Sequence, residues 1–180
     1  RAVGPTLTGF GVAGALADPV LTVFNSANAI IATNNDWGTP LGASGVPAAE
    51  LSAAFARVGA FSLGATSRDS AVIVTLPPGN YTAQVAGTGT STGVALAEVY
   101  EIGNTGAKLL NTSTRLTISA ASSPIIGMVV APGTGTRKLL IRTAGPALGA
   151  FGLTGTLADP QLVLKNSIGT TVARGVFLSI

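Results

Sequence analysis

The stretch RAVGPTLTGFGVAGALADPVLTVFNS at residues 1–26 returns at residues 142–167 as RTAGPALGAFGLTGTLADPQLVLKNS. The two copies align without a gap at a constant offset of 141 residues, and the correspondence extends over Arg1–Ala32 and Arg142–Ala173. A unit that recurs in a sequence is a unit that packs against its neighbours. The 180 residues therefore hold one complete unit and 39 residues of the next.

Small and β-branched residues dominate the composition. Hydrophobic residues make up 47% of the chain, aromatic residues only 5%, and there are 24 glycines. This mixture suits closely spaced strands joined by tight turns. Only 9% of the residues are charged, against about 25% in ordinary globular domains, so the surface must be covered by uncharged polar groups or by another protein. The mean hydropathy of +0.54 argues against a disordered chain.

The charge pattern excludes several classes of partner. The ten basic residues are scattered singly, apart from the pair Arg137-Lys138, and give a net charge of +3 and a pI near 9.8. Nucleic-acid-binding proteins concentrate their basic residues, so we expect no nucleic-acid partner. We also expect no membrane insertion, because no apolar run reaches the roughly 18 residues of a membrane span. No signal peptide opens the chain, so an exported protein would be in its mature form.

Short β-rich runs, separated by Gly, Pro or Asn, occupy almost the whole chain. One helix is expected over Pro47–Val58, with Pro at its first position and Gly59 as its stop. Pro78 and Gly79 predict a type II turn, in which Gly79 takes a positive φ. The expected strands are Val20–Asn25, Ala29–Thr33, Ser70–Leu76, Tyr81–Ala86, Val94–Ile102, Leu109–Ile118, Ile125–Val130, Lys138–Thr143, Gln161–Asn166 and Thr170–Ile180. Their number and spacing are typical of a β-sandwich or jelly roll.

Two motifs carry a family resemblance. The series DPVLTVFNS followed by IIATNNDWG within residues 18–38, and SAVIVTLPPGNYTAQV at residues 70–85, resemble the bacterial pre-peptidase C-terminal domain, a jelly-roll β-sandwich appended to secreted enzymes. The chain is also similar to the long repeats of secreted surface proteins of Verrucomicrobia-like bacteria. The resemblance covers residues 1–102 and, through the repeat, residues 109–180. It implies an exported, extracellular, non-catalytic module.

These observations predict an all-β fold, an antiparallel β-sandwich or jelly roll with at most one short helix. Residues 1–102 would form a sandwich that lacks its first strands, residues 103–108 a linker, and residues 109–141 the strands that complete a sandwich. Residues 142–180, the second copy of residues 1–39, are the candidate donor segment. A circularly permuted domain could close on itself, but the two copies would then compete for one place. The other solution is completion by strand exchange.

The surplus segment leads to a hypothesis of assembly. An unpaired strand edge seeks a partner, and a head-to-tail contact that does not close generates a filament. We therefore expect a structural subunit of an extracellular bacterial filament or surface assembly, a homopolymer held together by β-strand complementation. The alternative is a monomeric adhesion or carbohydrate-binding module of a larger surface protein, with surface glycans as partners, and a simpler explanation of the surplus is a longer array of repeats. The expected interface residues are Gln161, Leu162, Val163, Leu164, Val172, Val176, Phe177, Leu178 and Ile180.

Three smaller groups of residues invite a functional reading. Asn34, Asn35 and Asp36 offer oxygens of the kind that Ca²⁺ accepts, but one carboxylate is few for a calcium cage and such runs also favour turns. Trp37, Tyr81 and Tyr100 could form a sugar-stacking platform or could pack in the core. Arg1 and Arg142 precede Gly-Pro in both copies, where we expect an ion pair or a bond to a carbonyl group.

The sequence offers little to catalysis. The chain contains no His and no Cys, which removes the commonest general base and the thiol nucleophile. No Ser-x-x-Lys spacing occurs. Glu98 and Glu101 are three apart on an expected strand, so they would point to opposite faces and form a poor acid–base pair. We therefore expect no enzyme, no catalytic residue and no cofactor-binding residue, with Ca²⁺ as the one candidate ion.

Overall fold

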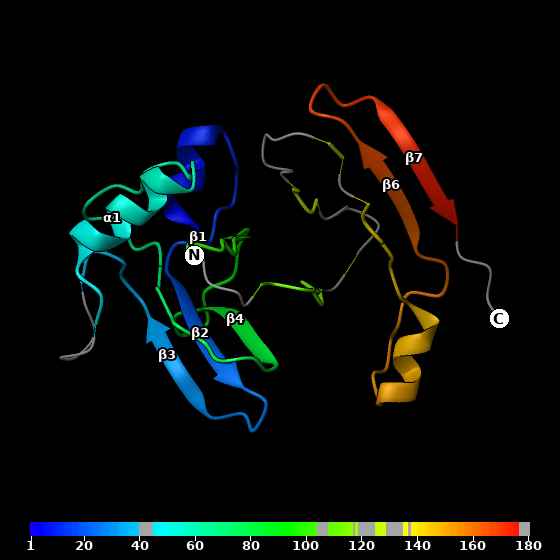
Figure 1. Cartoon of the computed structure of the whole chain (residues 1–180), viewed down its shortest axis with the longest axis horizontal. Helices are drawn as coiled ribbons and strands as arrows, with labels where there is room; N and C mark the ends of the chain where they lie inside the picture. The colour runs from blue at the N-terminus through cyan, green and yellow to red at the C-terminus, as the bar shows by residue number, and fades with distance from the viewer. Residues whose placement is uncertain are drawn as a thin grey trace. The chain divides into compact units, whose positions relative to one another are not determined.

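The structure, a computed structural model, describes residues 1–39, 45–103, 108–116, 118, 125–128, 135–136 and 138–176. The chain divides into two compact units, Arg1–Thr112 and Ser113–Ile180, called here the first and the second unit and described separately. Within the described residues the fold is β-rich, with short strands in small antiparallel sheets and few short helices (Figure 1). None of the helices that the structure describes has the length and apolar composition needed to cross a lipid bilayer.

The largest sheet of the first unit has the strand order β3-β2-β4, and both pairs are antiparallel. β2 forms because apolar residues alternate along it, so that Leu21 and Val23 are buried on one face. β4 lies along the whole of β2 without a register shift. The strands are β2 (Pro19–Asn25), β3 (Ile30–Asn34) and β4 (Tyr81–Gly87).

One helix and a short strand pair close the core of the first unit. α1 (Ala48–Arg57) forms within the expected range, although Pro47 is its N-cap and not its first residue, and the expected stop Gly59 follows it with a φ of +71°. β1 (Ala2–Val3) pairs with β5 (Leu96–Ala97). This strand pair ties the start of the unit to residues 96–97, whereas the buried core comes from residues 3–71. The core consists of Val3, Leu7, Trp37, Leu51, Phe55, Leu63 and Ala71.

The second unit repeats the beginning of the first in detail. In each unit a 3₁₀ helix starts at a Gly-Pro pair and ends at a left-handed glycine. β6 and β7 then pair in the register of β2 and β3, shifted by 141 residues, with the same bulge. Asn25 closes the first hairpin loop and Asn166 the second, each by accepting two main-chain N–H groups on its Oδ1. The repeated elements are η1 (Pro5–Phe10), η2 (Pro146–Phe151), β6 (Gln161–Lys165) and β7 (Thr171–Val176).

The expected strands are confirmed at β2, β3, β4 and β6, and at β7 as far as Val176, whereas the other five do not form as expected over the residues that the structure describes. Ser70–Leu76 forms no strand, because its first residues bond to separate segments: Ser70 pairs with Ala2, and the Ala71 N–H donates to the Asn34 side chain. Of the predicted strand over residues 94–102, only Leu96–Ala97 forms. The described residues of Leu109–Ile118, Ile125–Val130 and Lys138–Thr143 contain no strand.

The expected type II turn is also wrong. Gly79 does not belong to the glycines with positive φ. The Tyr81 hydroxyl instead donates to the Pro77 carbonyl oxygen at 2.9 Å, and the Tyr81 ring lies against Gly79. A side chain, rather than the φ of the glycine, therefore shapes this loop.

Candidate functional site

Arg1, the first residue of the repeat, is held by an ion pair and by a carbonyl group. It is 8% exposed. Its Nε and Nη2 donate to the Glu98 Oε2 at 2.9 and 2.6 Å, and its Nη1 donates to the Phe61 carbonyl oxygen at 2.6 Å. The guanidinium also lies 4.6 Å from the ring centres of Phe55 and Phe61, a distance at which cations are attracted to aromatic faces. Both expected roles are confirmed for Arg1.

The Glu98 carboxylate has a second partner. The Tyr100 hydroxyl donates to Glu98 Oε1 at 2.7 Å. Burial, followed by the hydrogen bond and the charge of Glu98, raises the pKa of Tyr100 above its ordinary value of 10.0. Glu101 accepts instead from the Leu109 N–H at 3.2 Å, so the two carboxylates have separate partners.

A buried carboxylate fixes the Gly-Pro loop of the first copy. Asp69 is 0% exposed. Its Oδ1 accepts the N–H groups of Gly4 and Thr6 at 2.7 and 3.4 Å, and its Oδ2 accepts the hydroxyls of Thr6 and Ser67. The Asp69 carbonyl oxygen accepts the Trp37 N–H at 2.8 Å. A buried charge is tolerated only when donors surround it, and here they come from the Gly-Pro loop and from Ser67.

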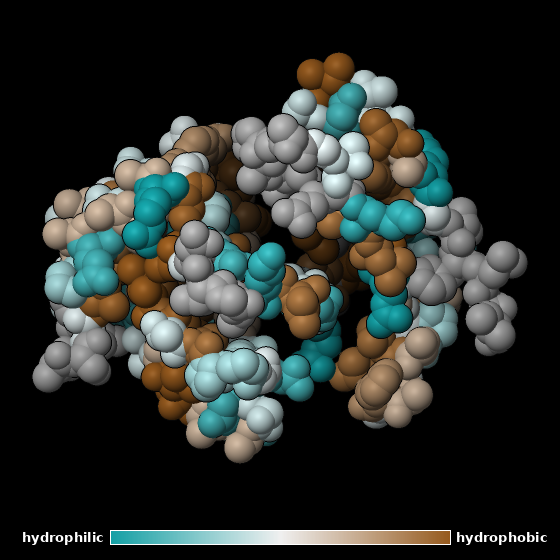
Figure 2. All heavy atoms as spheres, viewed as in Figure 1, coloured by the Kyte–Doolittle hydropathy of each residue, from teal (hydrophilic) through white to brown (hydrophobic). Residues whose placement is uncertain are grey.

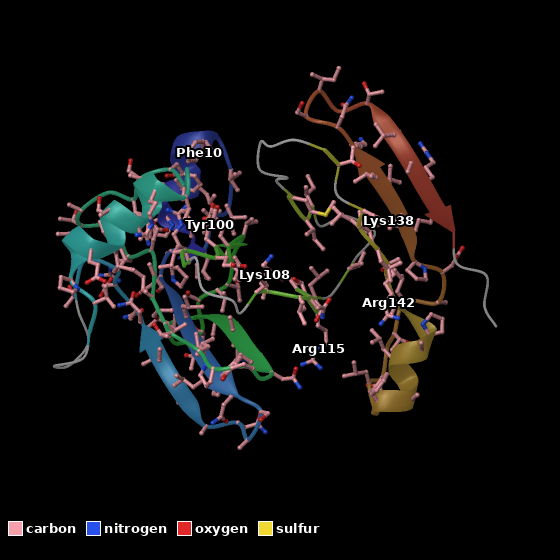
Figure 3. All side chains as sticks on the ribbon, viewed as in Figure 1. Phe10, Tyr100, Lys108, Arg115, Lys138 and Arg142 are labelled. Atoms are coloured by element: carbon pink, nitrogen blue, oxygen red, sulfur yellow. The ribbon has the colours of Figure 1, made fainter. Side chains whose placement is uncertain are left out.

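The second copy has the backbone of the first in a different environment. Leu16 is 5% exposed, whereas its counterpart Leu157 is 40% exposed. Arg142 is exposed, just before η2, in the position that Arg1 holds before η1 (Figure 3). Hydrophobic atoms reach the surface along the strands of the second unit (Figure 2). Several side chains that the first unit buries are therefore more exposed in the second unit.

The two copies also differ where the first copy contacts the rest of its unit. Thr6 donates to the Asp69 carboxylate, and the Asn34 Oδ1 accepts the Ala71 N–H at 3.1 Å. The second copy has no side chain that could make either bond, so it fits the place of the first copy poorly. Docking by displacement of the first copy is therefore unfavourable. The differing pairs are Val3 and Ala144, Thr6 and Ala147, and Asn34 and Gly175.

β6 and β7 carry most of the expected interface residues. Leu162 and Leu164 are half-buried on one face of β6, while Gln161 and Val163 are exposed on the other. Val172 is exposed on β7. Val176 is the last residue of β7, and Phe177, Leu178 and Ile180 lie outside the described residues.

The residues of the candidate calcium site make the hydrogen bonds of a turn. Asn34 is buried, and its side chain accepts from Ala71 and donates to the Asp36 carbonyl oxygen at 3.1 Å. The Asn35 Oδ1 lies 3.4 Å from the Thr88 hydroxyl. Among the described residues, no three acidic, His or Cys side chains gather as a metal site would need. The geometry therefore favours the turn.

The three aromatic residues of the candidate sugar platform have separate partners. Trp37 is buried 5.7 Å from the ring of Phe55, and its Nε1–H donates to the Gly64 carbonyl oxygen at 2.9 Å. The hydroxyls of Tyr81 and Tyr100 bind a carbonyl oxygen and a carboxylate within the first unit. Core packing is therefore the correct interpretation for Trp37, which has no face available to a ligand.

The sequence alone does not identify Asp69 and Glu98 as the groups that hold the first copy. They lie 65 and 97 residues from their partners Gly4 and Arg1. One signal was available for Glu98, because acidic residues are scarce in this chain and Glu98 stands between the apolar residues Ala97 and Val99. A carboxylate in such a run is expected to be paired. The sequence does not say with which residue.

Comparison with known proteins adds no assignment. No family model, no curated protein and no solved structure matches the chain. The resemblance to the pre-peptidase C-terminal domain therefore stays a prediction that rests on the sequence motifs.

Proposed function

We propose that the chain is a structural subunit of an extracellular bacterial filament or surface assembly, in which the second unit of one copy docks head to tail on the first unit of the next. The repeated hairpin carries this proposal. In the first unit β2 lies between β3 and β4, whereas β6, its copy, pairs with β7 alone within the described residues. An edge of unpaired N–H and C=O groups binds a further strand, which supports assembly through this hairpin.

The distribution of charge favours contacts between unlike units. Residues 1–112 contain four basic and six acidic side chains, a net charge of −2, whereas residues 113–180 contain six basic and one acidic, a net charge of +5. Opposite net charges attract unlike units and oppose the pairing of like units. A contact between unlike surfaces extends into a filament when it does not close on itself.

The complete architecture of the sheets and the cellular location of the protein are part of the same proposal. A sandwich or jelly roll would be completed by strands of a neighbouring copy, and a surface with few charges suits burial between copies. The resemblance to secreted surface repeats supports an extracellular or cell-surface location. The alternative, a monomeric adhesion or carbohydrate-binding module, draws no support from Trp37, because that side chain is buried.

Sedimentation velocity over a range of protein concentrations, combined with negative-stain microscopy, tests the proposal. We expect the mean mass to rise with concentration from that of the 17.7 kDa monomer, and elongated particles to appear. A monomer at every concentration contradicts the proposal and leaves the monomeric surface module as the function.

A further inference from the structure

We infer that copies join by addition of β6 of one copy to the outer edge of β4 of the next, which gives a sheet of order β3-β2-β4-β6-β7 across two chains. The inference rests on the proposed function and names the two surfaces through which it acts. The partner is a second copy of this chain. No strand has to leave its own sheet, so neither repeat copy displaces the other.

The positions of the bulges select these two edges. In the part of the chain that the structure describes, β3, β4, β6 and β7 each have an unpaired edge. Between β2 and β3 a bulge inserts Ile31, and between β6 and β7 the same bulge inserts Val172. A bulge bends the strand that carries it and protects its edge from a further strand. β4 and β6 are the regular strands, they contain no proline, and Lys165 is the one charged residue on them.

The main-chain groups of β6 point toward the required partner. Within the hairpin the Asn166 N–H donates to the Thr170 carbonyl oxygen at 2.9 Å. The direction of N–H and C=O groups alternates along a strand, so a residue three positions away faces the other side. Val163 therefore presents its N–H and C=O at the open edge of β6, and not to β7.

The same alternation gives the outward groups of β4. The Asn25 N–H donates to the Ala29 carbonyl oxygen, toward β3, so Thr22 faces β4. Thr22 lies opposite Gln84, whose N–H and C=O therefore face β2. Ala83, the neighbour of Gln84, presents its N–H and C=O at the outer edge of β4.

Charge decides between this pair and the symmetric pairs. A β4–β4 contact would join two units of charge −2, and a β6–β6 contact two units of charge +5, whereas a β4–β6 contact joins −2 to +5. Charge complementarity therefore favours the unlike pair. After one such contact, a β6 edge remains open at one end and a β4 edge at the other, so the assembly propagates.

Two proline variants test the inference, because proline lacks the N–H that an added strand requires. Val163→Pro removes the open-edge N–H of β6, and Ala83→Pro removes that of β4. Neither change removes a hydrogen bond within the chain's own sheets. The matched controls Val163→Thr and Ala83→Ser keep the N–H. We expect each proline variant to be monomeric at concentrations at which the wild type and both controls assemble.

Mixing the two proline variants gives the sharpest result. Val163→Pro retains a working β4 edge and Ala83→Pro a working β6 edge, so an equimolar mixture is expected to form a dimer and nothing larger. Far-UV circular dichroism checks that each variant is folded, and the fluorescence of Trp37 adds a check of the first unit, which carries Ala83→Pro. If a proline variant does not fold, hydrogen exchange of the wild type decides: the amides of Val163 and Ala83 must gain protection on assembly.

Three results would overturn the inference: proline variants that assemble like the wild type, a mixture that stays monomeric or grows beyond a dimer, or no added protection at these amides. If one of these results is found while the wild type still assembles, the choice of the β4 and β6 edges is wrong and the proposed function still stands. A wild type that is monomeric at every concentration overturns both.

Discussion

Asp69 shows how one side chain holds distant segments together. Its carboxylate is buried and accepts from four donors, on Gly4, Thr6 and Ser67. Asp69→Asn keeps the size of the side chain but removes the charge that strengthens these bonds and turns an NH₂ group toward donors. We expect the free energy of unfolding to fall by about 3 kcal/mol. Urea denaturation followed by the fluorescence of Trp37 measures it.

The control for this prediction is Asp36→Asn, because the Asp36 side chain is only half-buried and lies outside this network. It should cost less than about 0.5 kcal/mol, as surface substitutions usually do. Equal losses in the two variants would mean that the Asp69 network contributes nothing specific.

Tyr100 gives a prediction that depends on pH. Its pKa is raised above 10.0 by burial and by Glu98, so the fold favours the neutral phenol. This contribution to stability is therefore complete below the pKa that Tyr100 has in the unfolded chain, and it is lost as the pH rises through the higher pKa of Tyr100 in the folded chain. In a Tyr81→Phe background Tyr100 is the one tyrosine, and its absorbance should titrate with a midpoint above 10.0. Glu98→Gln should lower the midpoint, whereas Glu101→Gln should leave it unchanged.

At the residue scale, the sequence predicts the kind of contact that a side chain makes better than it predicts the partner residue. Arg1 is predicted to make an ion pair or a carbonyl contact because it recurs beside Gly-Pro, and it makes both. Its acid, Glu98, is 97 residues away. Nothing in local pattern links two groups that only the closed fold brings within hydrogen-bond distance.

Two equivalent glycines test whether the repeated element behaves alike in both units. A Cβ at Gly4 would overlap the Leu16 carbonyl oxygen, and a Cβ at Gly145 would overlap that of Leu157. Because a backbone atom must then move, we expect Gly4→Ala to destabilise the first unit by about 3 kcal/mol. Gly145→Ala should leave the Trp37 transition unchanged, since Trp37 lies in the first unit, and should instead accelerate hydrogen exchange in β6 and β7.

The matched controls are Gly9→Ala and Gly149→Ala, because a Cβ at either position meets nothing within 4 Å. Each should be neutral or stabilising by up to about 1 kcal/mol, through the entropy of the unfolded chain. A destabilised first unit in Gly145→Ala would refute the independence of the two copies.

At the element scale, short β-rich runs bounded by turn residues predict the strands that are paired along their length. Both ends of β2, β3, β4 and β6 and the start of β7 are predicted to within a residue, whereas the expected end of β7 at Ile180 lies outside the described residues. Ser70–Leu76 has the same composition but forms no strand, since Ser70 bonds to Ala2 and Ala71 to the Asn34 side chain, on two different segments. The 3₁₀ helices η1 and η2 were predictable from the Pro at their start and the Gly at their end.

For the whole molecule, the sequence predicts a duplicated element and a β-rich fold, but not the division of charge. The unequal charges of −2 and +5 become visible only once the boundary after Thr112 is known. Along the chain the ten basic residues look evenly scattered. The expected sandwich likewise depends on which distant strands pair with one another, and the spacing of strands along the chain does not determine that pairing.

This division of charge predicts how assembly responds to salt. Exposed charges interact over a Debye length, which shrinks from about 10 Å at 0.1 M salt to about 3 Å at 1 M. If unlike units attract, the mean mass in sedimentation velocity should fall as sodium chloride is raised at constant protein concentration. Lys165→Gln together with Arg174→Gln lowers the charge of the second unit from +5 to +3 and should flatten the salt dependence. A mean mass that rises with salt would mean that apolar faces, such as that of Leu162 and Leu164, drive the contact, because high salt strengthens apolar burial while it weakens attraction between charges.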